Sequence, residues 1–236
     1  MLAERHPNCS AELTLTCRCA RQLSSVLRGE DPLPLLFPDG SLADTENLYQ
    51  ASPPARAYNS LIASALEAAL RDWPAARPLR VLEIGAGTGS TTAYVLPVLA
   101  ALGARLDYTF TDIGRGFLQR ARDKFADSPR MQYAALDVTS DPVLQGFTTG
   151  SYDIIIAANV LHATPDLALT VGNVGKLIAP GGLLVLLEGS TTQRFGDLTV
   201  GKRASKATCS GTSVTCTPAC SISGTEEIPP TPWMLV

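Results

Sequence analysis

The sequence is poor in histidine and in charged side chains, and these shortages exclude several classes of protein. It has two histidines, His6 and His162, and none of its six cysteines forms a C-x-x-C pair. We therefore expect free thiols and no metal site. Because the net charge is −3 and no basic block occurs, we expect no nucleic-acid partner. No apolar run approaches the roughly 18 residues of a membrane span, and no signal peptide is visible, so we expect a cytoplasmic protein.

The chain does have a run of apolar residues that leads into a glycine-rich loop. Hydrophobic residues make up 45% of the 236 residues, which suits one sizeable core with an appended helical piece. Val81 to Ile84 is apolar except for Glu83, glycine follows at alternate positions from Gly85 to Gly89, and Thr91 to Leu102 is typical of a helix. A strand, a glycine loop and a helix in this order predict the first unit of a parallel α/β sheet. A ligand would lie at the N-terminus of the helix, where free N–H groups point.

The details of this loop argue against a dinucleotide as the ligand. The G-x-G-x-x-G pattern requires a glycine at position 90, which is Ser90, and here the glycine falls at Gly89 instead. Glu83 precedes the first glycine by two residues, and its carboxylate suits an ammonium group better than a pyrophosphate. A tight turn without any ligand remains the alternative.

The stretch Glu83-Ile-Gly-Ala-Gly-Thr-Gly89 resembles the first motif of class I S-adenosylmethionine (SAM) methyltransferases. The resemblance implies a Rossmann-like, mostly parallel, three-layer α/β fold with SAM as cofactor. It also implies that the methionine end of SAM lies against the glycine loop, with Glu83 acting near it.

Two acidic residues follow the next two predicted strands. Asp112 ends the strand Asp107 to Thr111, 23 residues after Gly89, where a carboxylate can accept both ribose hydroxyls. Its alternative role is to cap the following helix. Asp137 follows a short strand from Met131, and the resemblance implies that it meets the adenine amino group, while a turn-forming role is the alternative.

The N-terminal part resembles a narrower family. Three segments carry this resemblance, Leu35-Leu-Phe-Pro-Asp-Gly-Ser41, Leu48-Tyr-Gln-Ala-Ser-Pro53 and Ala55-Arg-Ala-Tyr-Asn59, and they are similar to the lead-in of the C-methyltransferase domains of type I polyketide synthases. This family acts in the biosynthesis of secondary metabolites on an acyl chain tethered to an acyl carrier protein, beside neighbouring synthase domains. The resemblance implies a set of cofactor-binding residues: Glu83, Gly85, Ala86, Gly87, Gly89, Asp112, Ile113, Asp137, Val138 and Asn159.

His162 and Glu188 are the candidate catalytic residues. His162 follows the apolar strand Tyr152 to Ala157, and Glu188 ends the strand Leu183 to Leu187. If these strands are parallel neighbours, both side chains emerge at the same rim of the sheet. A carboxylate beside a histidine fixes its tautomer and raises its basicity, as general base catalysis requires. The resemblance implies a catalytic His–Glu dyad at these positions, and a purely structural histidine is the alternative.

The predicted organisation has three parts. Residues 1–75 form an N-terminal helical lid, with helices over Ala11 to Leu27 and Tyr58 to Leu70, and residues 76–201 form the SAM-binding core. Residues 202–236 are rich in Ser, Thr, Cys and Pro, which predicts a disordered tail. The family resemblance stops at about Gly201, as after a frame shift or truncation. The last strands of the family's sheet are therefore expected to be missing, which would leave the strand before Glu188 as an exposed edge.

The expected function is SAM-dependent C-methylation of the α carbon of a β-ketoacyl chain on an acyl carrier protein. One alternative is an N- or O-methyltransferase of a peptide synthetase or a small molecule. Another is an inactive SAM-binding or scaffold fragment.

Overall fold

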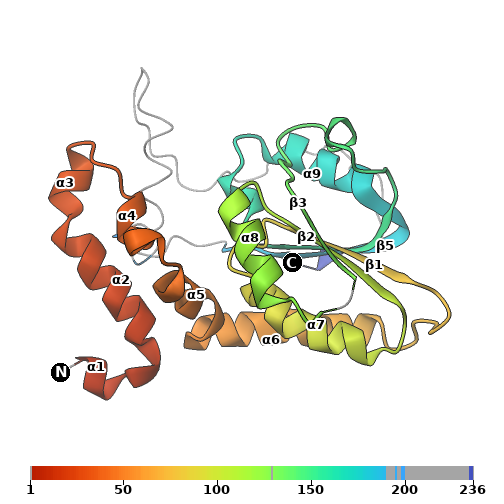
Figure 1. The fold of residues 1–236 in the computed structure, drawn as a ribbon, viewed down its shortest axis with the longest axis horizontal. Coiled ribbons are helices and arrows are strands. Elements are labelled where there is room, and N and C mark those ends of the chain that lie inside the picture. The colour runs from red at the N-terminus through yellow and green to blue at the C-terminus, as the bar shows by residue number, and fades with distance from the viewer. Residues whose placement is uncertain (1, 129, 190–194, 196–197, 200–233, 236) are drawn as a thin grey trace, which may run out of the picture.

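The computed structural model describes residues 2–128, 130–189, 195, 198–199 and 234–235, and it shows a parallel sheet flanked by helices (Figure 1). The strand order is β3-β2-β1-β4-β5-β6, and every pair of neighbours is parallel. The strands are β1 (Leu79–Ile84), β2 (Leu106–Thr111), β3 (Met131–Ala134), β4 (Tyr152–Ala158), β5 (Ile178–Leu187) and β6 (Met234–Leu235). This arrangement confirms the predicted Rossmann-like α/β fold.

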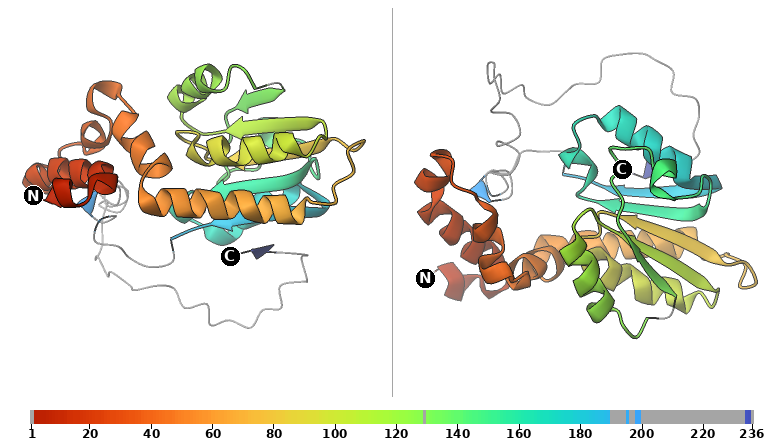
Figure 2. Two further views of the ribbon diagram at one scale, coloured as in Figure 1. Left: turned by 90° about the horizontal axis from the view of Figure 1, so that it is seen from below. Right: turned by 45° about the horizontal axis from the view of Figure 1, so that its top comes forward.

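Helices cover both faces of the sheet. The helices of the chain are α1 (Leu2–Arg5), α2 (Ser10–Arg21), α3 (Leu23–Leu27), α4 (Leu33–Leu36), α5 (Ala43–Gln50), α6 (Pro53–Ala69), α7 (Ser90–Ala101), α8 (Arg115–Lys124) and α9 (Leu167–Leu177). Short 3-10 turns occur at η1 (Pro7–Cys9), η2 (Pro38–Gly40), η3 (Val143–Gln145) and η4 (Leu161–Ala163). Residues of α6, α7 and α8 pack in one core cluster and residues of α9 in another, which gives the three layers seen in Figure 2. Within the described residues, no helix combines the length and apolar character needed to cross a membrane.

The central strands β1 and β4 are almost entirely buried. Leu82 and Ile155 are each 0% exposed, and the register pairs them directly. A strand that is covered on both faces appears as a continuous apolar run, which is why both strands are recognisable from the sequence. The strand order changes direction between β1 and β4, and α/β sheets bind ligands at the carboxyl ends of the strands at such a point.

The helices α1 to α5 form a separate layer beyond the carboxyl ends of the strands (Figure 1), and we call them the lid. The lid has its own small core, to which Phe195 and Leu198 from the segment after β5 contribute. The predicted lid extended to residue 75, but Ile62 and Leu66 of α6 pack in the core of the sheet. Helix α6 therefore belongs to the sheet's helical layer.

Two predicted helices differ in their bounds from the observed ones. The helix expected over Ala11 to Leu27 is two helices, because the backbone leaves helical geometry at Gln22, between α2 and α3. Helix α6 begins before Tyr58, at Pro53, because the Ser52 hydroxyl accepts a hydrogen bond from the Ala55 N–H and proline favours the first turn.

The prediction that β5 is an exposed edge is wrong over part of its length. Leu184 and Val185 pair in parallel with Met234 and Leu235 of β6. An open strand edge offers free N–H and C=O groups, and a short extended segment from elsewhere in the chain can satisfy them. The rest of the predicted tail, residues 202–233 and 236, lies outside the described residues, as do Cys209, Cys216 and Cys220. Cys9 and Cys17 are free thiols, and Cys19 is buried in the small core of the lid.

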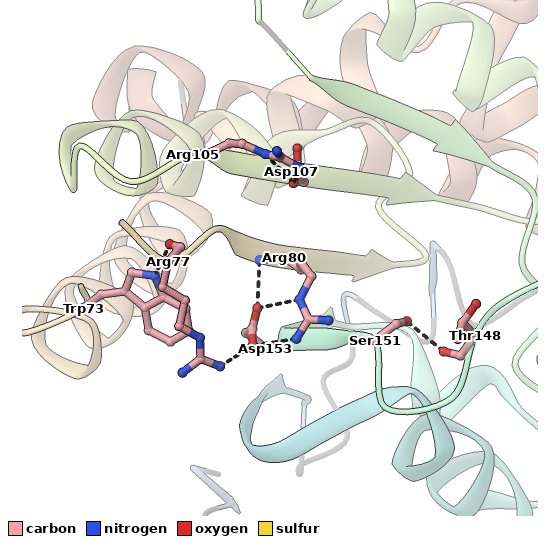
Figure 3. Close-up of polar contacts among 8 residues, drawn as sticks. All are labelled: Trp73, Arg77, Arg80, Arg105, Asp107, Thr148, Ser151 and Asp153. Carbon is pink, nitrogen blue, oxygen red and sulfur yellow. Dashed lines mark hydrogen bonds and ion pairs between the residues drawn. The ribbon is translucent and has the colours of Figure 1, made fainter. Parts of the chain in front are cut away.

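At the amino ends of β1 and β4, Asp153 holds two arginines (Figure 3). Its carboxylate is 2% exposed and accepts hydrogen bonds from Arg80 Nε, at 2.9 Å, and from the Arg77 guanidinium, at 2.7 Å. The backbone N–H of Arg80 donates to the same carboxylate at 3.0 Å. Burial alone would raise the pKa of Asp153, but the hydrogen bonds and charge of Arg80 and Arg77 lower it below its usual value. This network ties β1 to β4 at the end of the sheet opposite the lid.

Replacing Asp153 by Ala should lower the free energy of unfolding by about 1–3 kcal/mol, because it removes a buried carboxylate and leaves the Arg80 N–H and two half-exposed arginines without their acceptor. The matched control is Asp107→Ala, since Asp107 pairs with Arg105 at 2.8 Å in an exposed position at the start of β2 (Figure 3). That exposed pair contributes at most about 1 kcal/mol. Urea unfolding of the three proteins measures the difference, and equal losses for the two variants would contradict the role given to Asp153.

Candidate active site

The glycine loop after β1 adopts a backbone shape that side chains would disrupt. Gly85, Gly87 and Gly89 have φ values of 58°, 55° and 71°. A Cβ at Gly85 would lie 2.2 Å from Val160 Cγ2, and one at Gly89 would lie 2.7 Å from a ring carbon of Phe125. At Gly87 the nearest atom would be 3.8 Å away. Side chains thus pack against the loop at its two ends, Gly85 and Gly89. The loop is open at its centre, Gly87, where a ligand can approach the backbone.

Asp112 connects the end of β2 to this loop. Its side chain is 7% exposed, and its two oxygens accept hydrogen bonds from Gly87 N–H at 3.0 Å and from Gly114 N–H at 2.7 Å. Burial raises the pKa of Asp112, and the two backbone hydrogen bonds partly oppose this effect. Helix α8 starts after Gly114 without a side-chain cap, so Asp112 is not its cap. Ile113, which follows, is 72% exposed at the same rim.

Glu83 lies beneath the glycine loop. The residue is 2% exposed, and its Oε2 accepts hydrogen bonds from the hydroxyls of Thr92 and Tyr108, each at 2.5 Å. Burial raises the pKa of Glu83 to about 7, although these two hydrogen bonds act in the opposite direction. The carboxyl group therefore holds the first turn of α7 and strand β2 by hydrogen bonds. Its interaction with an ammonium group of a ligand stays a prediction.

The two candidates after β3 occupy different environments. Asp137 Oδ1 accepts hydrogen bonds from the N–H and the hydroxyl of Thr139, at 2.9 and 2.6 Å, in the manner of a turn former. Its turn-forming role is thus observed, and its contact with adenine stays a prediction. Val138 is 6% exposed and packs in the core with α9. Its side chain is thus part of the core, and its contact with the cofactor stays a prediction.

The structure brings His162 and Glu188 together. His162 Nδ1 lies 2.5 Å from Glu188 Oε2, and Glu188 Oε1 accepts the N–H groups of Val160 at 3.0 Å and Leu161 at 2.6 Å. The Glu188 hydrogen bond raises the pKa of His162, more than burial lowers it. Burial alone would raise the pKa of Glu188, but hydrogen bonds from His162 and Leu161 lower it. With Nδ1 engaged by Glu188, Nε2 is the ring nitrogen that remains for chemistry.

Asn159 and Val160 connect this pair to the glycine loop. Asn159 has a φ of 53°, which is uncommon for a residue other than glycine, and its N–H donates to Leu187 O at 2.7 Å. The next side chain, Val160, lies against Gly85. On the other side of the loop, Ala86 N–H donates to Thr111 O at 2.9 Å. The predicted cofactor loop is therefore connected to the predicted dyad through Val160, whose N–H donates to Glu188.

A cavity of about 490 Å³ separates the lid from α8 and reaches Gly87 and Thr88. Its remaining walls come from the lid residues Ser41, Leu42, Ala43 and Glu46 and from the α8 residues Phe117, Arg120, Ala121 and Lys124. Sequence reasoning did not identify these α8 residues as part of the site. Their local pattern is that of an ordinary amphipathic helix with charged residues on its outer face.

The chain is similar to several known proteins. Residues 82–184 match the model of a methyltransferase domain family. The chain is 40% identical over 195 residues to the polyketide synthase ThaG of Burkholderia thailandensis, covering 81% of this chain and 4% of that protein. It superposes on the CurJ carbon methyltransferase with a TM-score of 0.81 and 46% identity, covering 85% of this chain and 53% of that one. The trans-methyltransferase CalH, in complex with SAH, gives a TM-score of 0.63 and 35% identity over 78% of this chain and 50% of that one.

Replacing Glu188 by Gln should lower the pKa of His162, because the neutral amide no longer stabilises the imidazolium charge. The titration of the imidazole C–H signals by NMR measures this shift. If the His162 titration were the same in both proteins, the ion pair with Glu188 would not exist in solution.

Proposed function

We propose that the chain is a SAM-dependent methyltransferase domain, related to the carbon methyltransferases of polyketide synthases, and that it methylates the α carbon of a β-ketoacyl chain tethered to an acyl carrier protein. The observation that carries this proposal is the His162–Glu188 pair at the carboxyl ends of β4 and β5. A carbon acid requires a base, and this pair supplies one beside the glycine loop.

The residues around the loop fit SAM. The open backbone at Gly87 gives the methionine end room to approach, and the exposed Ile113 offers an apolar surface for the adenine ring. The Asp112 carboxylate already orients the loop through Gly87 N–H, and it has further lone pairs for ribose hydroxyls. SAM supplies a methyl group bonded to a positively charged sulfur. The protein aligns this methyl group with the acceptor carbon and excludes water from the site.

We assign the proton transfer to His162. Its Nε2 would take the proton from the carbon between the two carbonyl groups, and the electron pair left on that carbon would accept the methyl group that bound SAM supplies, with the methyl–sulfur bond broken in the same step. Glu188 holds the ring by Nδ1 and stabilises the imidazolium that results. The products are the α-methylated thioester, S-adenosylhomocysteine and a proton that passes from His162 to solvent.

The proposed partners follow from the relatives. ThaG is a polyketide synthase, and this chain covers 4% of its length, so we place the chain beside further synthase domains and a carrier protein. The lid lies over the rim that carries the glycine loop, and the cavity between lid and α8 gives a route by which a tethered chain could enter. Assignment of the acyl carrier protein as the substrate's carrier belongs to this proposal.

Asp112→Ala should weaken the binding of SAM by about 1–3 kcal/mol, because it removes a charged acceptor and frees Gly87 N–H. Isothermal titration calorimetry measures the change. Asp107→Ala, at the opposite end of β2, is the matched control and should bind SAM as the parent does. A parent protein that preferred NAD to SAM would overturn the assignment of the cofactor.

His162→Ala should reduce methyl transfer to an acetoacetyl carrier protein by at least about 10²-fold, since a general base contributes on that scale. The binding of SAM should change little. Since only the neutral imidazole accepts a proton, the parent's rate should rise with pH through a midpoint above the ordinary histidine value of 6.5. Glu188→Gln should be less harmful and should move this midpoint to lower pH. Mass spectrometry of the carrier-protein adduct follows the reaction.

The control for these variants is His6→Ala, which replaces the histidine outside the site. A His162→Ala protein that methylated at the parent rate would rule out the dyad. An N- or O-methyltransferase, which relies mainly on proximity, would then be the better interpretation.

A further inference from the structure

Lys124, the last residue of α8, joins the lid to the glycine loop. Its ammonium group donates to Glu46 Oε1, to Gln50 Oε1 at 2.9 Å and to the backbone oxygen of Thr88 at 3.2 Å. Glu46 and Gln50 lie four residues apart on the lid helix α5, so they project from the same face of that helix. A lysine ammonium has three N–H groups, and the three oxygens around it match that number.

The same end of α8 also supports the loop by packing. Phe125, the next residue, fills the space in which a Cβ on Gly89 would lie. From the other side, Asp112 accepts the N–H of Gly87. The loop is therefore fixed at three consecutive residues, by a carboxylate at Gly87, by the Lys124 ammonium at Thr88 and by an aromatic ring at Gly89.

The contact with the lid is the part of this arrangement that can open. Lys124 and Glu46 are 26% and 38% exposed, and exposed ion pairs contribute at most about 1 kcal/mol to stability. The lid has a core of its own, distinct from the two core clusters of the sheet. Helix α8 makes a second polar contact with the lid, from the Arg120 guanidinium to Gly40 O. Both contacts border the cavity that reaches Gly87 and Thr88.

We propose that Lys124 is a positioning residue that sets the glycine loop for the amino-acid end of SAM only while the lid is docked on α8. The inference rests on the proposed placement of SAM over this loop. A loop that is already held in its binding shape loses less conformational freedom when the ligand binds. Docking of the lid and binding of the amino-acid end of SAM then favour each other, because each requires the same geometry at Thr88.

The test compares two ligands and two charge-removing variants of α8. Lys124→Met should raise the dissociation constant of SAM about three- to tenfold, the range expected for a partly exposed charged hydrogen bond. It should leave the affinity for methylthioadenosine, which lacks the amino-acid end, within about twofold of the parent. Arg122→Met is the matched control, since Arg122 lies over the Tyr133 ring, 5.4 Å from its centroid, and belongs to the same helix. It should bind both ligands as the parent does.

The lid side of the contact provides the second measurement. Glu46→Gln should also raise the dissociation constant of SAM. The double variant, Glu46→Gln with Lys124→Met, should bind SAM as tightly as Lys124→Met alone, because both substitutions break the same contact. Full additivity, unchanged SAM binding by Lys124→Met, or an equal loss for both ligands would overturn the inference. A general structural defect would give the last of these results. A parent that bound methylthioadenosine but not SAM would instead count against the cofactor assignment on which the inference rests.

Discussion

The hydrogen bonds of the Glu188 carboxylate determine the geometry of the candidate active site. One oxygen holds the imidazole of His162, and the other accepts the N–H groups of Val160 and Leu161. The carboxylate at the end of β5 therefore shapes the turn at the end of β4 as well as the ring that the turn carries. Because Val160 packs on Gly85, this turn also determines how closely the cofactor loop can approach the base. The candidate catalytic pair and the glycine loop are thus parts of one packed unit.

The pKa values of the buried carboxyl groups are shifted in opposite directions at the two ends of the sheet. Asp153, at the amino ends of the strands, is surrounded by arginine donors, and its pKa is lowered. Glu83 and Asp112, at the carboxyl ends, have only neutral partners among their hydrogen bonds, and burial raises the pKa of both. The ion pairs of Asp153 therefore lie at one end of β1, and the rim that carries the glycine loop lies at the other.

The lid lies beyond the carboxyl ends of the strands, and its apolar core is separate from that of the sheet. It packs around its own apolar cluster and touches α8 through one aromatic pair, Phe37 and Phe117, and through the polar groups of Lys124 and Arg120. Polar contacts at an exposed boundary break at a small cost, whereas the apolar core of the sheet does not separate. The boundary between lid and α8 is therefore held less firmly than the core of the sheet.

The sequence by itself determined the fold class and the residues of the dyad. Buried parallel strands appear as apolar runs, and a strand, glycine loop and helix in succession leave few other topologies. Since parallel neighbours end at one rim, the positions of His162 and Glu188 along the chain are enough to pair them. The partners of Glu83, the turn around Asp137, the link from Lys124 to α5 and the short strand β6 were decided only by the tertiary structure. These features depend on contacts between distant segments or on local backbone geometry. Contacts and geometry of this kind leave no periodic signal in the sequence.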